Sequence, residues 1–281
     1  TYTVTLEATN AGGSDTETKT GYITVEAASS GLVFETGTLA NVGSSWQTVT
    51  LTNTYTSPVV VCSSDNGPSG LPAVTRVRNA SGNSFEVMVQ NPSGTSLTGY
   101  DVHYLVVEEG VYTVADHGVK MEAVKATSVQ TANNTSWIVE TRTYQNSYTN
   151  PVVVGQVMTY NDSDWSVFWA SNGTRTAPPS ATAFAAGKNV GEDTNRTRAN
   201  ETIGYVVIEQ GNGTVNGISY AAALGSDIVK GPDDTSTGYT YSFGSIPTAS
   251  TAIVSAAAMD GNNGGWPVLY GSSPLTSTSL L

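Results

Sequence analysis

The sequence has almost no cysteine and little charge. Cys62 is the only cysteine among 281 residues, so an intrachain disulfide and a Cys-x-x-Cys metal site are both excluded. It follows the apolar run 59–61, which favours a small buried strand residue over a reactive thiol. Only 12% of the residues are charged, whereas Thr, Ser, Asn and Gly are abundant. This composition is more typical of exported β-rich proteins than of cytoplasmic enzymes.

Basic residues and long apolar segments are scarce as well. The chain has 11 Lys and Arg against 23 Asp and Glu, a formal net charge of −12. It therefore lacks the cationic patch with which a protein binds nucleic acid or an anionic membrane surface. No apolar run approaches the roughly 18 residues of a membrane-spanning helix. We expect neither a nucleic-acid partner nor membrane insertion.

Catalytic constellations are also missing. The two histidines, His103 and His117, are not accompanied by a Gly-x-Ser-x-Gly nucleophile elbow, so Ser-His-Asp chemistry is not predicted. Paired carboxylates could serve a glycosidase, but each pair lies in or beside a turn and is expected to be solvated. These pairs are Glu108 with Glu109, Glu192 with Asp193, and Asp162 with Asp164. The sequence predicts a protein that is not an enzyme and requires no cofactor.

What the sequence does contain is a repeated strand pattern. The stretch 54–61 recurs at 147–154 with Tyr, Thr, Pro and three Val in register, and a weaker version spans 245–254. Each is a polar turn closed by proline and followed by a β-branched run, which suits a buried strand. The strand 104–108 recurs at 205–209. Short strands separated by Gly, Pro, Asn and Ser turns predict an all-β fold of tandem antiparallel β-sandwiches.

The first 27 residues form a distinct segment. Tyr2, Val4, Leu6 and Ala8 alternate with polar residues, a turn follows at 10–14, and a partner strand returns. This stretch resembles the last two strands of a polycystic-kidney-disease (PKD) type domain. The resemblance implies a β-sandwich spacer of the kind found in secreted and cell-surface proteins. Since two strands are marginal alone, we expect the segment to be part of a longer polypeptide or to be completed by another chain.

The repeats divide the remaining sequence. We predict a partial PKD-like sandwich at 1–27, a linker at 28–30, complete sandwiches at 31–113 and 114–216, and an incomplete third sandwich at 217–281. Tandem modules of this kind predict a rod with small interfaces between neighbours. The recurring Trp, Pro-Val-Val strand and Tyr-Val-Val-Ile-Glu strand resemble H-type-lectin-like sandwiches. The resemblance implies glycan binding or adhesion, although it maps no sugar-contacting residue onto this sequence.

Two kinds of ligand site are suggested by loop composition. Aromatic side chains near loops could stack on sugar rings, and the candidates are Trp165, Trp169, Trp266 and Tyr270. Trp165 and Trp169 share one strand face, so core packing is the alternative. Loops dense in oxygen donors could hold a structural Ca²⁺ through Asp162, Asp164, Asp260 and Asn262, although neither loop matches an EF-hand.

Asn-x-Ser/Thr sequons are frequent and mark possible glycosylation sites. They begin at Asn79, Asn133, Asn134, Asn161, Asn172, Asn195, Asn200 and Asn212.

These features predict a non-catalytic secreted or cell-surface protein whose modules bind polysaccharide or glycoprotein glycans, or mediate adhesion. An alternative is a self-associating subunit of an extracellular filament, sheath or surface layer. Assembly would then occur by strand complementation between incomplete sandwiches. A second alternative is an accessory segment of a larger polysaccharide-degrading enzyme.

Overall fold

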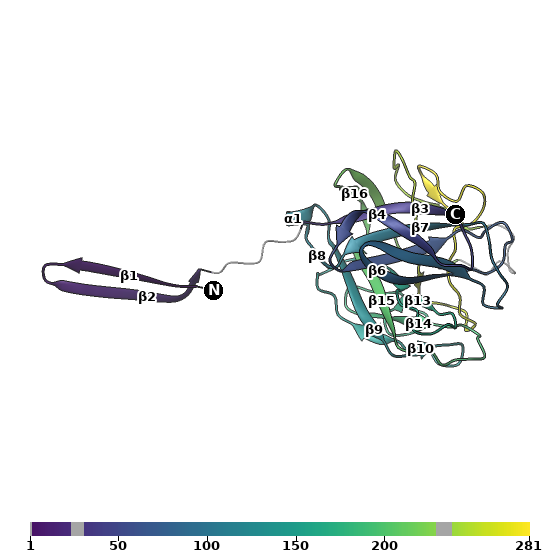
Figure 1. Ribbon diagram of the computed structural model, residues 1–281, viewed down its shortest axis with the longest axis horizontal. Helices are drawn as coiled ribbons and strands as arrows, with labels where there is room; N and C mark the ends of the chain where they lie inside the picture. Colours follow the sequence, from purple (N-terminus) through teal and green to yellow (C-terminus); the bar gives the residue numbers. More distant parts are fainter. Residues whose placement is uncertain (1, 24–30, 229–237) are drawn as a thin grey trace. The chain divides into compact units, whose positions relative to one another are not determined.

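A computed structural model describes residues 2–23, 31–228 and 238–281 (Figure 1). Strands are nearly the whole of the regular secondary structure in the described residues, which confirms the predicted all-β fold class with several antiparallel sheets. Its single helix, α1 (Val114–His117), is one turn long and ends at Gly118, which has a φ of 73°. The chain forms two compact units, residues 1–31 and residues 32–281.

The first unit is a β-hairpin. Strand β1 (Tyr2–Asn10) pairs antiparallel with β2 (Gly13–Ile23), as the alternating sequence predicts. All side chains from 3 to 22 are exposed, including Leu6 and Tyr22 at 68% and 67%. The hairpin therefore has no core of its own. The linker predicted at 28–30 lies outside the described residues.

The second unit begins with a two-sheet sandwich. One sheet has the order β3 (Phe34–Val42), β7 (Tyr100–Glu108), β5 (Pro58–Ser64), and the other pairs β4 (Gln47–Tyr55) with β6 (Val74–Gln90). Strand β5 confirms the strand predicted from the Pro-Val-Val pattern, and β7 contains the predicted strand 104–108. Within the residues of β6 the chain reverses direction at 79–83, because the Asn91 amide donates to the Pro72 carbonyl at 2.9 Å and Arg78 donates to Glu86 at 3.0 Å. Asn79 and Gly82 have φ of 52° and 58°, the left-handed conformation that is common in turns.

A second sandwich follows. Its first sheet has the order β12 (Pro151–Val157), β15 (Glu201–Glu209), β9 (Met121–Ser128), β8 (Gly110–Tyr112). Its second sheet has the order β10 (Thr131–Ala132), β14 (Phe184–Asn189), β13 (Val167–Ser171), β19 (Ala256–Ala257), with β11 (Glu140–Arg142) paired to β14. The remaining strands form two small ladders, β16 (Gly211–Val215) with β17 (Ile218–Ala222) and β18 (Tyr241–Ser242) with β20 (Ser279–Leu280).

Equivalent glutamates fix the same turn in both sandwiches. Glu108, at the end of β7, accepts the backbone N–H groups of residues 56 and 57 at 2.8 and 2.7 Å. Glu209, at the end of β15, accepts those of residues 149 and 150 at 3.0 and 2.6 Å. In each case the carboxylate of the closing strand holds the turn that precedes the Pro-Val-Val strand. The repeat in the sequence is thus a repeat of tertiary contacts.

The two sandwiches share a core, so the rod-like arrangement predicted from the sequence is wrong for residues 32–281. All seven residues of β5 are buried, and Val59 and Val60 pack in one cluster with Met158 and Val206 of the second sandwich. The two sandwiches approach closely at Gly204 of β15, where a Cβ atom would lie 3.1 Å from Cγ1 of Val59. A strand that is apolar on both faces needs a covering layer on each side, and the neighbouring sandwich supplies the second one.

The residues after 217 do not form a separate sandwich in the described structure. The strand predicted at 245–254 is not formed, and only β19 just after it pairs, parallel to β13. In this segment the Ala258 N–H donates to the Ala170 carbonyl at 2.8 Å. The Asn66 N–H donates to the Leu269 carbonyl at 2.8 Å in the same way. The C-terminal segment therefore contacts both sandwiches.

The contacts of this segment follow a cyclic, approximately three-fold pattern. The Ser63 hydroxyl bonds both the N–H and the C=O of Val254, at 2.9 and 3.1 Å. The Ser255 hydroxyl bonds both the N–H and the C=O of Gly155, at 3.0 and 3.3 Å. Gln156, at the equivalent position of the second repeat, bonds Thr75 of the first. The segments around residues 63, 156 and 255 thus meet in a ring, and each is hydrogen-bonded to the next repeat.

Candidate functional site

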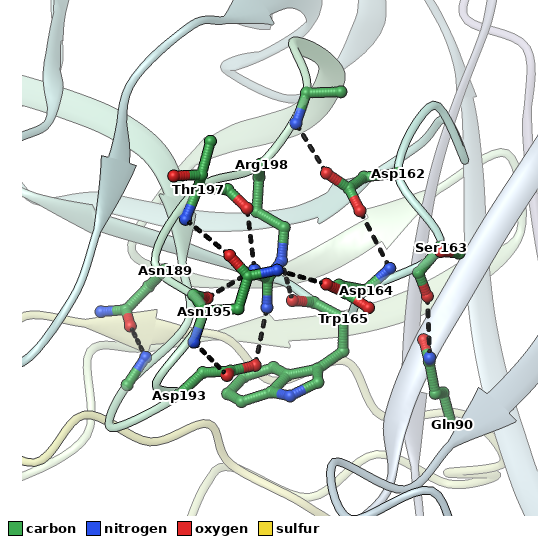
Figure 2. A network of polar contacts seen from close by, with 12 residues as sticks. Gln90, Asp162, Ser163, Asp164, Trp165, Asn189, Asp193, Asn195, Thr197 and Arg198 are labelled. Carbon is green, nitrogen blue, oxygen red and sulfur yellow. Dashed lines mark hydrogen bonds and ion pairs between the residues drawn. The ribbon is translucent and has the colours of Figure 1, made fainter.

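The predicted acidic and aromatic loop is organised by Arg198 (Figure 2). Its guanidinium group is fully buried and donates to the carbonyls of Trp165, Asn195 and Thr197 at 2.8, 2.6 and 2.9 Å. It also forms an ion pair with Asp193 at 2.8 Å. These bonds join loop 158–166, which follows β12, to loop 190–200, which precedes β15. The arginine satisfies backbone carbonyls that would otherwise lack donors.

Both acidic candidates of this loop are hydrogen-bond acceptors within it. Asp162 accepts the backbone N–H groups of Asp164 and Ala199 at 3.0 and 2.8 Å, and Asp164 accepts the Asn195 amide at 2.6 Å (Figure 2). Burial raises the pKa of Asp162, but these two N–H groups and the nearby Arg198 charge hold it below its ordinary value. The Asp162 carboxylate therefore stabilises the loop as an anion.

The other predicted calcium loop lies beside the same region. Asp260 and Asn262 are exposed, and the loop packs so closely that a Cβ at Gly264 would lie 2.5 Å from the Gly191 Cα. Arg175 donates to the Asp260 carbonyl. Within residues 2–23, 31–228 and 238–281, no group of three or more His, Cys, Asp or Glu side chains is placed to hold a metal. The structural Ca²⁺ stays a prediction, with Arg198 filling the centre of the first loop.

Two of the four aromatic candidates are core residues. Trp165 is 7% exposed and Trp169 is 0% exposed. The ring centroids of Trp169 and Trp137 are 5.6 Å apart, and the two rings pack edge to face. Trp169 belongs to strand β13, whose five residues are all buried. A sugar can stack only on an exposed ring face, so the prediction that these two tryptophans form a glycan platform is wrong. The alternative of core packing is confirmed.

The Trp266 ring packs against the Trp165 ring. Their ring centroids are 5.3 Å apart, although the residues are far apart in the sequence. Trp266 is half-buried and its indole N–H donates to the Ala73 carbonyl at 2.7 Å, so it joins the C-terminal segment to the first sandwich. Tyr270 is also half-buried, and its role in glycan binding, like that of Trp266, stays a prediction.

A second aromatic cluster escaped the sequence reasoning. Arg78 lies 4.1 Å from the Trp46 ring centroid, Tyr160 packs edge-on against Trp46 at 5.1 Å, and Arg76 lies 4.6 Å from the Tyr160 ring. Arg76 also donates to the Asp162 carbonyl at 2.8 Å. Arg76 and Arg78 are two residues apart on one strand, and side chains with this spacing lie on the same face of a sheet. This spacing in the sequence could have predicted that the two arginines lie together. The cluster joins the first sandwich to loop 158–166.

The residues examined for catalysis have structural contacts. The His103 Nδ1 accepts the backbone N–H of Ala252 at 3.2 Å, and burial lowers the pKa of this imidazole. Glu109 accepts the Ser57 hydroxyl at 2.7 Å. Cys62 is a free, buried thiol whose pKa is raised by burial, which confirms the prediction of a buried strand residue. Each of these groups holds two segments together.

The sequons differ in accessibility. Asn133 is buried at 6%, and its side chain accepts the backbone N–H groups of residues 135 and 136. The half-buried sequon residues are Asn134 and Asn172, and the exposed ones are Asn79, Asn161, Asn195, Asn200 and Asn212. The structure leaves glycosylation at the exposed positions as a prediction.

A small cavity lies where the three equivalent segments meet. Its lining includes Ser63, Thr75, Gln156, Ser255 and Trp266, so each repeat contributes to it. The polar atoms of this lining are engaged with one another across the repeats, as described above. In the described part of the chain, no helix has the length and apolar character required to cross a membrane.

Comparison with known proteins gives one similarity. The chain is 27% identical over 208 residues to Halomucin from Haloquadratum walsbyi. The matched region covers 70% of this chain but only 2% of Halomucin, so the chain spans a small fraction of that relative. No protein-family model matches the chain, and no solved structure matches it.

Proposed function

We propose that this chain is a non-catalytic module of a long secreted or cell-surface polypeptide. One observation carries the proposal: the polar and titratable groups that could form a site are bonded into the fold. Arg198, Asp162, Glu108 and His103 each hold loops or segments together, and these contacts join the repeats. Such an arrangement suits a mechanically and chemically resistant spacer.

The similarity to Halomucin supports the proposed location. The matched stretch amounts to 2% of that protein, so the similarity concerns a small part of a very long chain. The low content of charged residues, the single buried cysteine and the acidic net charge fit an exported β-rich protein. An all-β fold with large buried strands also suits a structural module.

The location can be tested on intact cells. An antibody raised against residues 32–281 is applied to whole cells, to the culture medium and to lysed fractions, before and after external protease treatment. The proposal expects the protein in the medium or on the cell surface, where protease removes it. Detection only in the protease-protected cytoplasmic fraction would overturn it.

Glycan binding is a second candidate function, and one observation favours it. Trp266 and Tyr270 are half-buried rather than buried, and they follow the exposed loop 260–263. A partly exposed aromatic ring beside amide groups is suited to stacking on a sugar. A glycan array probed with the wild type and with Tyr270→Ala tests it. Binding that Tyr270→Ala abolishes supports this function, and no binding by the wild type rejects it.

A further inference from the structure

In both complete sandwiches the Pro-Val-Val strand has a closing strand on one edge. In β5, Val59 pairs with Val107 of β7 and Val61 pairs with Leu105. The Asp65 N–H donates to the Asp101 carbonyl at 2.9 Å, which shows that odd-numbered backbone groups of β5 point to β7. Strand β12 is paired with β15 in the same manner. The opposite edge of each strand faces the ring of three segments.

The segment 251–257 is the third member of this ring but has only one of its two edges occupied. On the ring side, the N–H of Ala252 donates to His103, and Val254 bonds the Ser63 hydroxyl. On the other side, the backbone groups of Thr251, Ile253 and Ser255 have no hydrogen-bond partner in the described structure. This is the edge that a closing strand covers in the two complete sandwiches.

The strand that would flank such a closing strand on its far side is present. Strand β17 pairs with β16, in the way that β9 pairs with β8 in the second sandwich. Unlike β9, which also pairs with β15, β17 has no partner on its other edge among the described residues. Tyr220 of β17 and Ile253 both pack against the same buried cluster. In the third repeat, β17 and the segment 251–257 are therefore present, but the strand that would pair between them is not found among the described residues.

We propose that this gap is an acceptor site for one extended peptide strand that runs antiparallel to 251–257. The pattern of the occupant follows from the two closing strands: β-branched residues that alternate between the two cores, and a terminal glutamate, as in 205–209. That glutamate would accept the unpaired N–H groups of residues 248 and 249, as Glu108 accepts those of 56 and 57. β-Strand addition of this type derives its affinity from main-chain hydrogen bonds and its specificity from alternate side chains.

The closing strands of this chain cannot supply the occupant. Strand β7 is paired on both edges by β3 and β5, and β15 is paired on both edges by β9 and β12. The occupant is therefore a segment of polypeptide from outside these two strands. The inference deepens the proposed function, because it specifies how the module joins other polypeptide. Strand addition and surface location are measured separately, so either one can fail alone.

The test uses the full chain and a synthetic peptide with the sequence of residues 201–209. Hydrogen exchange of the backbone amides is measured with and without peptide. We expect exchange at Ile253 and Ser255 to slow by about tenfold or more as these groups gain ladder partners. The Val254 amide, already bonded to Ser63, serves as the internal control and should not change.

Two matched controls and one tethered form make the result decisive. A peptide with Val206→Pro loses an N–H on the edge that faces β12, so it should not protect Ile253, whereas a peptide with Val206→Ile keeps that N–H and should protect it. The same nine-residue sequence is also attached after Leu281 through a flexible linker, which supplies an effective concentration of about millimolar. Protection of Ile253 by the tethered strand supports the proposal. Absence of protection in both forms, or an Ile253 amide that is already slow in the chain alone, overturns it.

Discussion

The buried guanidinium of Arg198 gives the sharpest stability prediction. Its four bonds reach three backbone carbonyls and the Asp193 carboxylate, at 2.6 to 2.9 Å. At about 1 kcal/mol for each bond, Arg198→Met should lower the free energy of unfolding by about 4 kcal/mol. Breaking a buried ion pair by removing one partner gives a similar magnitude, roughly 3–5 kcal/mol. That is a large part of the 5–15 kcal/mol that is typical of a domain.

Urea unfolding followed by tryptophan fluorescence measures this effect, since Trp165 lies in the affected loop. The matched control is Arg196→Met in the same loop, because Arg196 is exposed and, among the residues that the structure describes, donates only to Asn134. The control should change the free energy of unfolding by less than about 1 kcal/mol. Arg198→Lys should fall between the two, because an ammonium group cannot reach the same carbonyls as the planar fork. A loss below about 1 kcal/mol for Arg198→Met would refute the role assigned to this residue.

Three further predictions concern the shared core, the ring contact and the net charge. Gly204→Val should destabilise residues 32–281 by about 2–3 kcal/mol in urea unfolding, because its side chain would displace Met158 and Val59, and an unchanged midpoint would contradict the shared core. His103 has a pKa lowered by burial, so its contribution to stability is present above the unfolded pKa of about 6.5 and is lost as pH falls below it. The free energy of unfolding should therefore fall between pH 7 and pH 5 more steeply for the wild type than for His103→Asn, and equal slopes would contradict the burial of this imidazole in its neutral form. Because acids exceed bases by 12, added NaCl should raise the melting temperature by screening repulsion, and a decrease would show that ion pairs dominate.

Much of the fold could be predicted because the deciding signals are local. The period-two alternation at 2–8 predicted strand β1, and the Pro-Val-Val pattern predicted β5 and β12. The repeated strands 104–108 and 205–209 place Glu108 and Glu209 at equivalent positions, and the two residues make equivalent contacts in the structure. The spacing of Trp165 and Trp169 was compatible with either a core or an exposed platform, because a period of two indicates which residues share a face but not what covers that face.

The covering layers were decided by contacts between distant parts of the chain. Trp165 is buried because Trp266 packs against it, and Arg198 occupies the centre of a loop whose oxygen-rich sequence predicted a cation. Neither contact can be predicted from a short stretch of sequence, because each joins residues that only the folded arrangement of the repeats brings together.

By itself the sequence determined an all-β chain with a hairpin and repeated strands, because strand pattern and turn chemistry act over a few residues. Only the tertiary structure decided that the repeats meet in a ring rather than in a row. The hydroxyl groups of Ser63 and Ser255 bond backbone groups of other repeats, and such contacts depend on the three-dimensional path of the chain. The same geometry left one edge of the segment 251–257 without a partner strand in the described structure, and no local pattern carries that information.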